Sequence, residues 1–332
     1  MADTFILREE YGRSEVDRKT PGAADARRVR EPIVSKYLAE QGLKFEYPDD
    51  KKFAVCLTHD VDDIYLPLSH AAMAAAFHAK NLDGRGLRKD VRLQRDENSP
   101  YRNFGKIMKI EEEYGAVSSF YFMATDRDPK RFRYDIEDMG NELGEIADRG
   151  WEVGLHGSYY AYNDPVEVRN EKSRLEKVLG KSVIGYRNHY LRLNVPHTWQ
   201  ILSDAGFLYD TTLGYSNIIG FRNGMCHPFR PYDLESGRQM DILEIPTAVM
   251  DCALFEQVRS LEDAWDLAKG AVDATERYGG VINLLWHNDT FSAPFRDRWV
   301  KVYDRLLKYG REKNAWITSG ENIFRWWQKN GR

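Results

Sequence analysis

Cysteine is scarce in this chain, and its placement does not suggest pairing. The three cysteines, Cys56, Cys226 and Cys252, are odd in number, lie far apart and form no CxxC motif. Scattered cysteines of this kind indicate reduced thiols, so we expect a cytoplasmic protein.

Several other features are also missing. The opening stretch, MADTFILREEYGRSE, is charged and lacks the apolar core of a signal peptide. No apolar run approaches the roughly 18 residues of a membrane-spanning helix. The net charge is −4 and the pI is about 6.1, so no basic surface for nucleic acid is indicated. No GxGxxG follows the first expected strand, which disfavours a dinucleotide-binding fold. We therefore expect no nucleic-acid partner and no membrane span, while the oligomeric state is left open.

The length and the apolar pattern indicate one α/β barrel. A chain of 332 residues suits a barrel of roughly 250 residues with additional segments. Short apolar stretches alternate with helical patterns, and a parallel sheet closed into a barrel is favoured over an open doubly wound sheet. Two helix starts are clear: Asp164 precedes Pro165, and Ser260 forms a capping box with Asp263. The expected strands are 53–60, 117–125, 152–157, 183–190, 207–213, 241–249, 281–289 and 315–320.

The same pattern divides the chain into parts. Residues 1–50 are expected to form a peripheral N-terminal extension with one helix, and residues 51–332 to form the barrel. The stretch 79–102 is long, polar and strongly charged, which indicates either an active-site lid or a solvated insertion. The stretch 220–233 is expected to be an ordered loop, either over the barrel mouth or simply packed.

The first strand ends in CLTHDVDDIY, where acidic residues follow a buried run. Side-chain alternation puts Asp60 and Asp62 on one face and His59 on the other, so His59 is expected to support the pair from behind. Two neighbouring carboxylates repel unless a cation or a proton lies between them. The structural alternative is that they cap a helix that begins near Leu66.

Later strand ends carry more polar residues, and in a barrel the active site lies at those ends. Arg187 and His189 alternate onto one face, and an arginine is a natural partner for an aspartate carboxylate. Carboxylates, imidazoles and a guanidinium that converge at one mouth predict metal-assisted or acid–base hydrolysis. These residues are His156, Arg187, His189, Asp210, His287 and Asp289.

At this point the chain resembles a known family. The ordered motifs THDVD, LHGSYY, YRNHY and LLWH are similar to those of the polysaccharide deacetylases with a NodB homology domain, carbohydrate esterase family 4. The resemblance runs from about residue 53 to about residue 290. It implies a distorted (β/α) barrel of seven or eight units. It also implies hydrolysis of an N-acetyl, sometimes O-acetyl, group on a sugar, usually with a divalent metal.

The resemblance also implies roles for the catalytic residues. Asp60 would be the catalytic base, and Arg187 would orient it. His287 would be the general acid. The backbone N–H of Tyr190 would help to stabilise the oxyanion.

The metal ligands match only in part. The resemblance implies that Asp62 and His156 are ligands, but Tyr160 stands where the family has a second ligand histidine, and His189 replaces a proline. Strand alternation turns His189 toward the mouth, so it is a candidate replacement ligand. The alternative is that His189 contacts substrate or packs, and that the metal is weak or absent.

The resemblance, together with these departures from it, implies three alternative functions. The first is a hydrolase that removes an N-acetyl group from an amino sugar, a glycan precursor, by metal-assisted acid–base attack of water, with zinc as the expected metal. The second is a metal-independent hydrolase of a cyclic amide or ureide. The third is a non-catalytic, glycan-binding barrel. Further substrate or oxyanion contacts are expected from Tyr160, Tyr190, Asp210 and Asp289.

Overall fold

The computed structural model describes residues 28–82, 99–126 and 133–331. Within these ranges nine strands share one sheet, and a small hairpin lies apart from them. The sheet strands are β1 (Phe53–Val61), β2 (Ser119–Phe122), β3 (Glu152–Gly157), β4 (Gly185–Asn188), β5 (Tyr209–Asp210), β8 (Leu243–Glu244), β9 (Thr247–Met250), β10 (Val281–Leu285) and β11 (Ala315–Thr318). The hairpin consists of β6 (Tyr232–Asp233) and β7 (Arg238–Gln239).

The sheet is parallel and curled. Its order is β8-β5-β4-β3-β2-β1-β10-β9, and β11 pairs with β1 outside this path. Every pairing within it is parallel. A parallel bridge from Gly214 to Thr247 of β9 brings the two ends of the order close together. The distorted (β/α) barrel predicted from the sequence is therefore confirmed.

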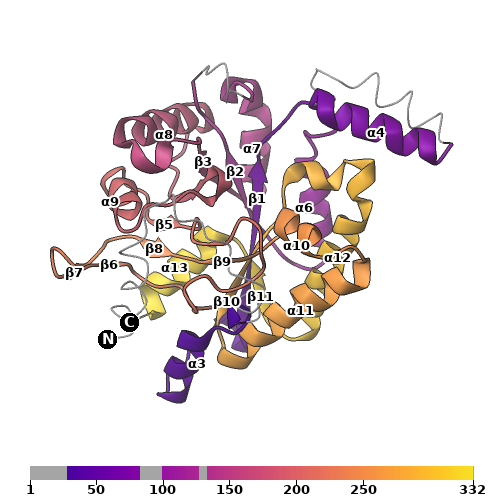
Figure 1. Ribbon diagram of the computed structural model, residues 1–332. Helices are drawn as coiled ribbons and strands as arrows, with labels where there is room; N and C mark the ends of the chain where they lie inside the picture. The colour runs from indigo at the N-terminus through magenta and orange to yellow at the C-terminus, as the bar shows by residue number, and fades with distance from the viewer. Residues whose placement is uncertain (1–27, 83–98, 127–132, 332) are drawn as a thin grey trace.

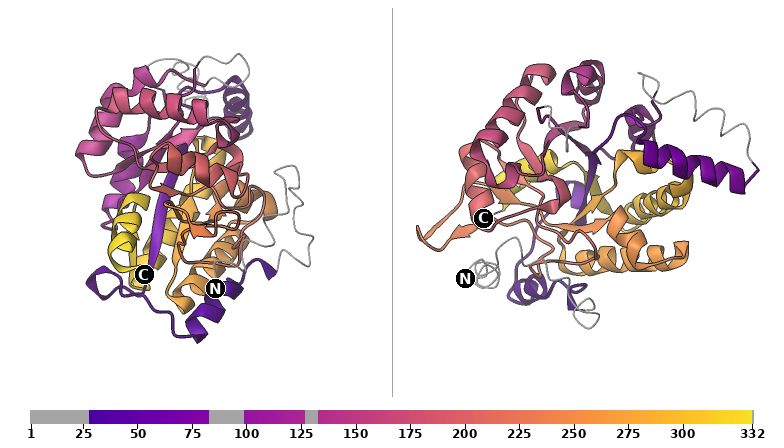
Figure 2. Two further views of the ribbon diagram at one scale, coloured as in Figure 1. Left: turned by 90° about the vertical axis from the view of Figure 1, so that its left-hand side faces the viewer. Right: turned by 45° about the horizontal axis from the view of Figure 1, so that its top comes forward.

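Helices surround the sheet in all three views (Figure 1 and Figure 2). The longer ones are α3 (Ile33–Glu40), α4 (Leu68–Lys80), α6 (Phe104–Glu112), α7 (Gly140–Asp148), α8 (Pro165–Leu179), α9 (His197–Asp204), α10 (Asp251–Gln257), α11 (Leu261–Tyr278), α12 (Asp297–Glu312) and α13 (Gly320–Asn330). Single 3-10 turns include η3 (Ala161–Asn163), η4 (His189–Leu191) and η5 (Asn288–Phe291). No helix of the described ranges is both long and apolar enough to cross a membrane.

Both expected helix starts are confirmed. Asp164 accepts hydrogen bonds from the backbone N–H groups of Val166 and Glu167 at the start of α8. Ser260 accepts one from the backbone N–H of Asp263 at the start of α11. These caps satisfy N–H groups that have no partner inside the helix.

Residues of β1 alternate between two sides of the sheet, as its sequence predicts. Phe53, Val55 and Leu57 belong to the large core between sheet and helices. Ala54 and Cys56 belong to a second core inside the barrel. This second core includes Trp326 and Trp327 of α13, so the last helix turns its tryptophans inward.

Several expected strands are shorter in the structure, and one is divided. The stretch 241–249 is not one strand, because β8 ends at Glu244 and β9 begins at Thr247. Pro246 lies between them, and proline has no N–H to donate to a sheet ladder. The strand expected over 183–190 ends at Asn188, and His189 begins the turn η4, in which Tyr190 has a φ of 59°.

The segment 220–233 does not lie over the mouth. The carbonyl of Cys226 accepts a hydrogen bond from Val281, the first residue of β10, and Gly224 accepts one from Val34 of α3. The segment therefore packs near the amino end of β10 and against the N-terminal residues. Most of the charged stretch 79–102, and residues 1–27 of the N-terminal extension, lie outside the described residues.

Candidate active site

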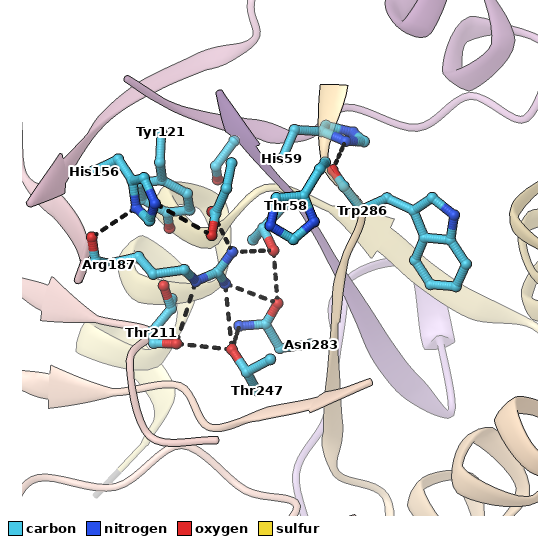
Figure 3. Close-up of polar contacts among 12 residues, drawn as sticks. Thr58, His59, Tyr121, His156, Arg187, Thr211, Thr247, Asn283 and Trp286 are labelled. Carbon is cyan, nitrogen blue, oxygen red and sulfur yellow. Dashed lines mark hydrogen bonds and ion pairs between the residues drawn. The ribbon is translucent and has the colours of Figure 1, made fainter. Parts of the chain in front are cut away.

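Asp60 and Arg187 form a buried ion pair inside the barrel. Arg187 Nη1 donates to Asp60 Oδ1 at 2.9 Å and to Thr58 Oγ1 at 2.8 Å. Burial lowers the pKa of Arg187, but the Asp60 carboxylate outweighs it and the net pKa is raised, so the guanidinium stays charged. The remaining contacts of the guanidinium are the Thr211 carbonyl, Thr247 Oγ1 and Asn283 Oδ1 (Figure 3). Arg187 thereby fixes the orientation of Asp60.

Asp62, His156 and His189 bring three ligand-type atoms together. His156 Nε2 is 3.2 Å from Asp62 Oδ1, and His189 Nδ1 is 3.3 Å from the same oxygen. The two imidazole nitrogens are 3.1 Å apart. The three atoms thus form a nearly equilateral triangle at the carboxyl ends of β1, β3 and β4.

The hydrogen bond of His156 determines which of its ring nitrogens carries a hydrogen, and therefore how its Nε2 interacts with Asp62. His156 Nδ1 is 3.0 Å from the Arg187 carbonyl, which can only accept, so Nδ1 carries the hydrogen. In a neutral ring, Nε2 then offers a lone pair toward Asp62. Among the described residues Asp62 Oδ1 has no hydrogen bond of normal geometry, although both nitrogens are close. A cation or an extra proton must offset the repulsion of these atoms.

The triangle also has the dimensions of a metal site. Tetrahedral zinc bonds of about 2.0–2.1 Å put neighbouring ligand atoms about 3.3–3.4 Å apart. The separations of 3.1–3.3 Å match one face of such a tetrahedron. Burial raises the pKa of Asp62, but His189 and His156 outweigh it and hold the pKa well below its usual range. The residues present therefore suit a divalent metal.

His287 faces the triangle from the other side of the mouth. Its Nε2 lies 3.9 Å from Asp62 Oδ2, and its Nδ1 lies 2.7 Å from Asp251 Oδ1. Asp251 is fully buried, and its Oδ2 accepts from the His287 backbone N–H and from Thr290 Oγ1. Burial lowers the pKa of His287, but Asp251 outweighs it and raises the pKa well above 6.5. The Asp251 carboxylate therefore favours the charged form of the ring, whose Nε2 lies toward Asp62.

A second cluster of ligand-type residues is a weaker candidate for a metal site than Asp62, His156 and His189. Asp251, Cys252 and His287 also bring ligand-type atoms close together. However, His287 Nδ1 is already hydrogen-bonded to Asp251, and the Cys252 Sγ atom is 3.9 Å away from it. Burial also raises the pKa of the Cys252 thiol, which disfavours the thiolate that a metal would need.

The five residues expected to converge, Asp60, Asp62, His156, Arg187 and His287, therefore lie around one site. The helix-cap alternative for the acidic pair is wrong. The next helix, α4, begins at Leu68 with Pro67 as its N-cap residue, and no side-chain hydrogen bond caps it. His59 supports the pair from behind as expected, because its ring bonds to the Trp286 carbonyl and to Glu111.

Tyr160 and Tyr190 lie at the rim. Their side chains are 56% and 54% exposed, and both rings pack against Tyr159. The Tyr190 ring is also 4.2 Å from that of His189. Arg192 lies 3.7 Å from the centre of the Tyr159 ring and donates to the Tyr159 carbonyl. Tyr160 is not part of the ligand triangle.

The two other acidic candidates differ from each other. Asp289 lies near the mouth, but its carboxylate is bound by Arg296 Nη1 at 2.6 Å and lies 3.6 Å from His70. Asp210 is fully buried, accepts from the Thr212 backbone N–H and hydroxyl, and lies near Glu244. A direct substrate contact by Asp210 is therefore not supported, because its side chain does not reach any surface.

Sequence reasoning missed the residues that hold the candidate catalytic side chains in place. Asp251 directly follows the apolar strand that ends at Met250, the same signal that identified Asp60. The polar partners of Arg187, among them Asn283 and Thr247, point inward from apolar strands and could not be recognised by pattern.

Comparisons with known proteins place this geometry on a known fold. No family model and no curated protein matches the chain. A crystal structure assigned as a polysaccharide deacetylase from Mycobacterium smegmatis matches 84% of this chain and 91% of its own, with TM-score 0.56 and 20% identity. The chain has the fold of the polysaccharide deacetylases. A second such assignment, from Pseudomonas aeruginosa PAO1, matches 86% and 95% of the two chains, with TM-score 0.54 and 16% identity. The allantoinase PuuE matches 87% and 94%, with TM-score 0.58 and 16% identity. At these identities the likeness is one of fold, and the activity must be argued from the site.

Proposed function

We propose that this polysaccharide-deacetylase-like protein is a hydrolase that removes an N-acetyl group from an amino sugar with the help of a bound divalent metal, most favourably zinc. The observation that supports this most directly is the triangle of Asp62, His156 and His189 beside an oriented carboxylate and a protonated imidazole. A metal at the triangle would act as a Lewis acid on the acetyl carbonyl.

The side chains around the triangle supply the proton transfers. Asp60, held by Arg187, accepts a proton from the attacking water. His287, charged because of Asp251, donates its Nε2 proton to the departing amine nitrogen. The left-handed backbone at Tyr190 turns the chain sharply beside His189, and the Tyr190 N–H is the proposed donor to the oxyanion.

A non-catalytic glycan-binding barrel needs none of this arrangement. Binding alone does not call for a fixed carboxylate facing a charged imidazole across a buried cluster. The buried ion pair of Asp60 and Arg187 also costs desolvation energy that simple packing would avoid. We therefore favour an enzyme.

The exposed rings of Tyr160 and Tyr190 support a sugar as the substrate. Aromatic faces at the rim can stack against the apolar face of a sugar ring, and the phenol hydroxyls can bond to its hydroxyl groups. Their rings are braced from behind by Tyr159, which Arg192 covers.

A second candidate is hydrolysis of a cyclic amide or ureide, without metal. The likeness to an allantoinase favours it, and so does the absence of a histidine at position 160. In that case a proton, rather than a metal, would lie among Asp62, His156 and His189.

Metal analysis combined with two assays separates these candidates. Protein purified without chelator or metal-affinity resin would be analysed for metal content. It would then be tested for acetate release from N-acetylated amino sugars and for ring opening of allantoin. One equivalent of metal together with acetate release supports the deacetylase. Ring opening by metal-free protein supports the second candidate, and inactivity in both assays with tight glycan binding supports the non-catalytic barrel.

A further inference from the structure

The catalytic acid and base lie on two segments that separate just before the site. β1 carries Asp60, and the segment after β10 carries His287. The last backbone hydrogen bond between them runs from the Trp286 N–H to the Thr58 carbonyl at 3.0 Å. Beyond this point β1 pairs with β2 on its other side, from Thr58 to Val61.

Two side chains connect the segments beyond that last bond. His59 Nδ1 lies 2.8 Å from the Trp286 carbonyl, and since a carbonyl can only accept, the imidazole donates (Figure 3). Asn288 Nδ2 donates to the Asp63 carbonyl at 2.9 Å. Both His59 and Asn288 are completely buried.

The positions of these bonds relative to the catalytic residues are informative. Residues 59 and 63 bracket Asp60 and Asp62, whereas residues 286 and 288 bracket His287. The two side-chain bonds thus join the flanks of the base to the flanks of the acid. We propose that His59 and Asn288 are positioning residues that set the separation of Asp60 and His287. This inference rests on the proposed roles of those two residues.

Further contacts hold both positioning residues rigidly. His59 Nε2 lies 2.8 Å from Glu111 Oε1, and Glu111 also accepts from Trp151, Ser118 and Tyr303. The second amide hydrogen of Asn288 goes to the Tyr101 carbonyl at 2.8 Å. Several buried hydrogen bonds restrict the rotation of these side chains. A positioning residue must be held in this way if it is to hold another residue in place.

A merely structural role would give a different result from a positioning role. If His59 only filled the core, substitutions would lower stability without a specific effect on turnover. If His59 positions His287 through the Trp286 carbonyl, the Nδ1 bond matters for turnover and the Glu111 bond matters mainly for stability.

Two substitutions at His59 separate the two bonds. In His59→Asn the amide nitrogen occupies the place of Nδ1 and can still donate to the Trp286 carbonyl. In His59→Gln the amide reaches the place of Nε2, so the Glu111 contact is kept and the Trp286 bond is lost. Glu111 keeps three other donors in His59→Asn, so that variant is expected to fold.

The experiment measures kcat, KM and the melting temperature of both variants. The substrate is the one that the acetate-release and ring-opening assays identify for the wild-type protein. We expect His59→Asn to retain kcat within about threefold. His59→Gln should lose about 10- to 100-fold in kcat with little change in KM, since misplacement by about 1 Å can cost 10²-fold. Equal kcat values in the two variants would overturn the proposal.

A second readout does not depend on any activity. Hydrogen–deuterium exchange of the peptide containing residues 286–291 should be faster in His59→Gln than in His59→Asn. If the wild-type protein hydrolyses nothing, this difference still establishes the link, and its absence rejects it. Should both His59 variants fail to fold, Asn288→Ala tests the second bond: faster exchange around residues 59–63 with reduced kcat supports the proposal, and unchanged exchange refutes it.

Discussion

His156 Nε2 lies 3.1 Å from His189 Nδ1, and each nitrogen lies within 3.3 Å of the same oxygen of Asp62. His156 donates its Nδ1 hydrogen to the Arg187 carbonyl, an orientation typical of metal-ligating imidazoles. The position of His189 is unusual, because the family that the sequence resembles has a proline there. Compared with the motifs that the sequence resembles, the site has an imidazole at position 189 in place of a proline and a tyrosine at position 160 in place of a histidine.

The first prediction concerns His189 as a ligand. His189→Ala should lower bound metal and activity together, because Asp62 and His156 alone offer too few donors for tight binding. Excess metal should partly restore the activity. Metal content, measured by mass spectrometry after dialysis, is the primary readout. His197→Ala, an exposed histidine at the start of α9, is the matched control and should change neither quantity. Full metal occupancy in His189→Ala would show that His189 is not a metal ligand.

The second prediction concerns the base. Asp60→Asn should reduce kcat by roughly 10²–10⁴-fold, because the amide cannot accept the proton of the attacking water. Metal content should not change, since Asp60 Oδ2 is 3.7 Å from His156 Nε2 and Asp60 is not part of the ligand triangle. The melting temperature reports whether the loss of the Arg187 ion pair also destabilises the fold. A variant with a near-normal rate would assign the base to another residue.

The third prediction concerns pH. Turnover needs protonated His287, so the rate should fall as the pH rises through the raised pKa of His287. Burial alone lowers this pKa, and the Asp251 carboxylate is what raises it. Asp251→Asn should therefore move the alkaline fall of the pH–rate profile to lower pH and reduce kcat at neutral pH by roughly 10²-fold. The measurement is kcat between pH 5 and pH 10, and an unmoved alkaline limb would show that His287 is not the acid.

The sequence predicts the barrel well because its strands are locally encoded. Apolar alternation along β1 correctly separates Asp60, which faces the barrel interior, from His59, which faces the surrounding helices. Both helix caps are also local signals, within a few residues of the side chains that make them. Such features need no information about distant parts of the chain.

Features that depend on distant contacts could not be predicted in the same way. His189 reaches the ligand triangle, but through a turn after the end of β4 and not through strand alternation. Asp210 sits at a strand end like Asp60, yet it faces Glu244 and is buried. The Asp251–His287 bond spans 36 residues, so neither residue alone reveals it.

The fourth prediction tests whether the substrate is a sugar that stacks on the rim. Tyr160 is about half exposed, and its ring packs edge-on against Tyr159 at the rim. Tyr160→Ala should raise KM for an N-acetylated oligosaccharide about 10-fold while changing kcat little, because stacking binds the ground state and the transition state alike. Tyr160→Phe keeps the ring and should stay within about threefold of wild type.

Two comparisons make this test specific. Tyr37→Ala removes an equally exposed tyrosine on α3, near the amino end of β10 and away from the mouth, and should leave KM unchanged. If Tyr160 contacts a sugar next to the reacting one, a free N-acetylated monosaccharide should show a smaller Tyr160 effect than an oligosaccharide. Equal effects on the two substrates would mean that Tyr160 contacts the reacting sugar itself. No effect on either would remove the rim tyrosine from the binding site, and with it the strongest structural reason for preferring a sugar to a small cyclic ureide.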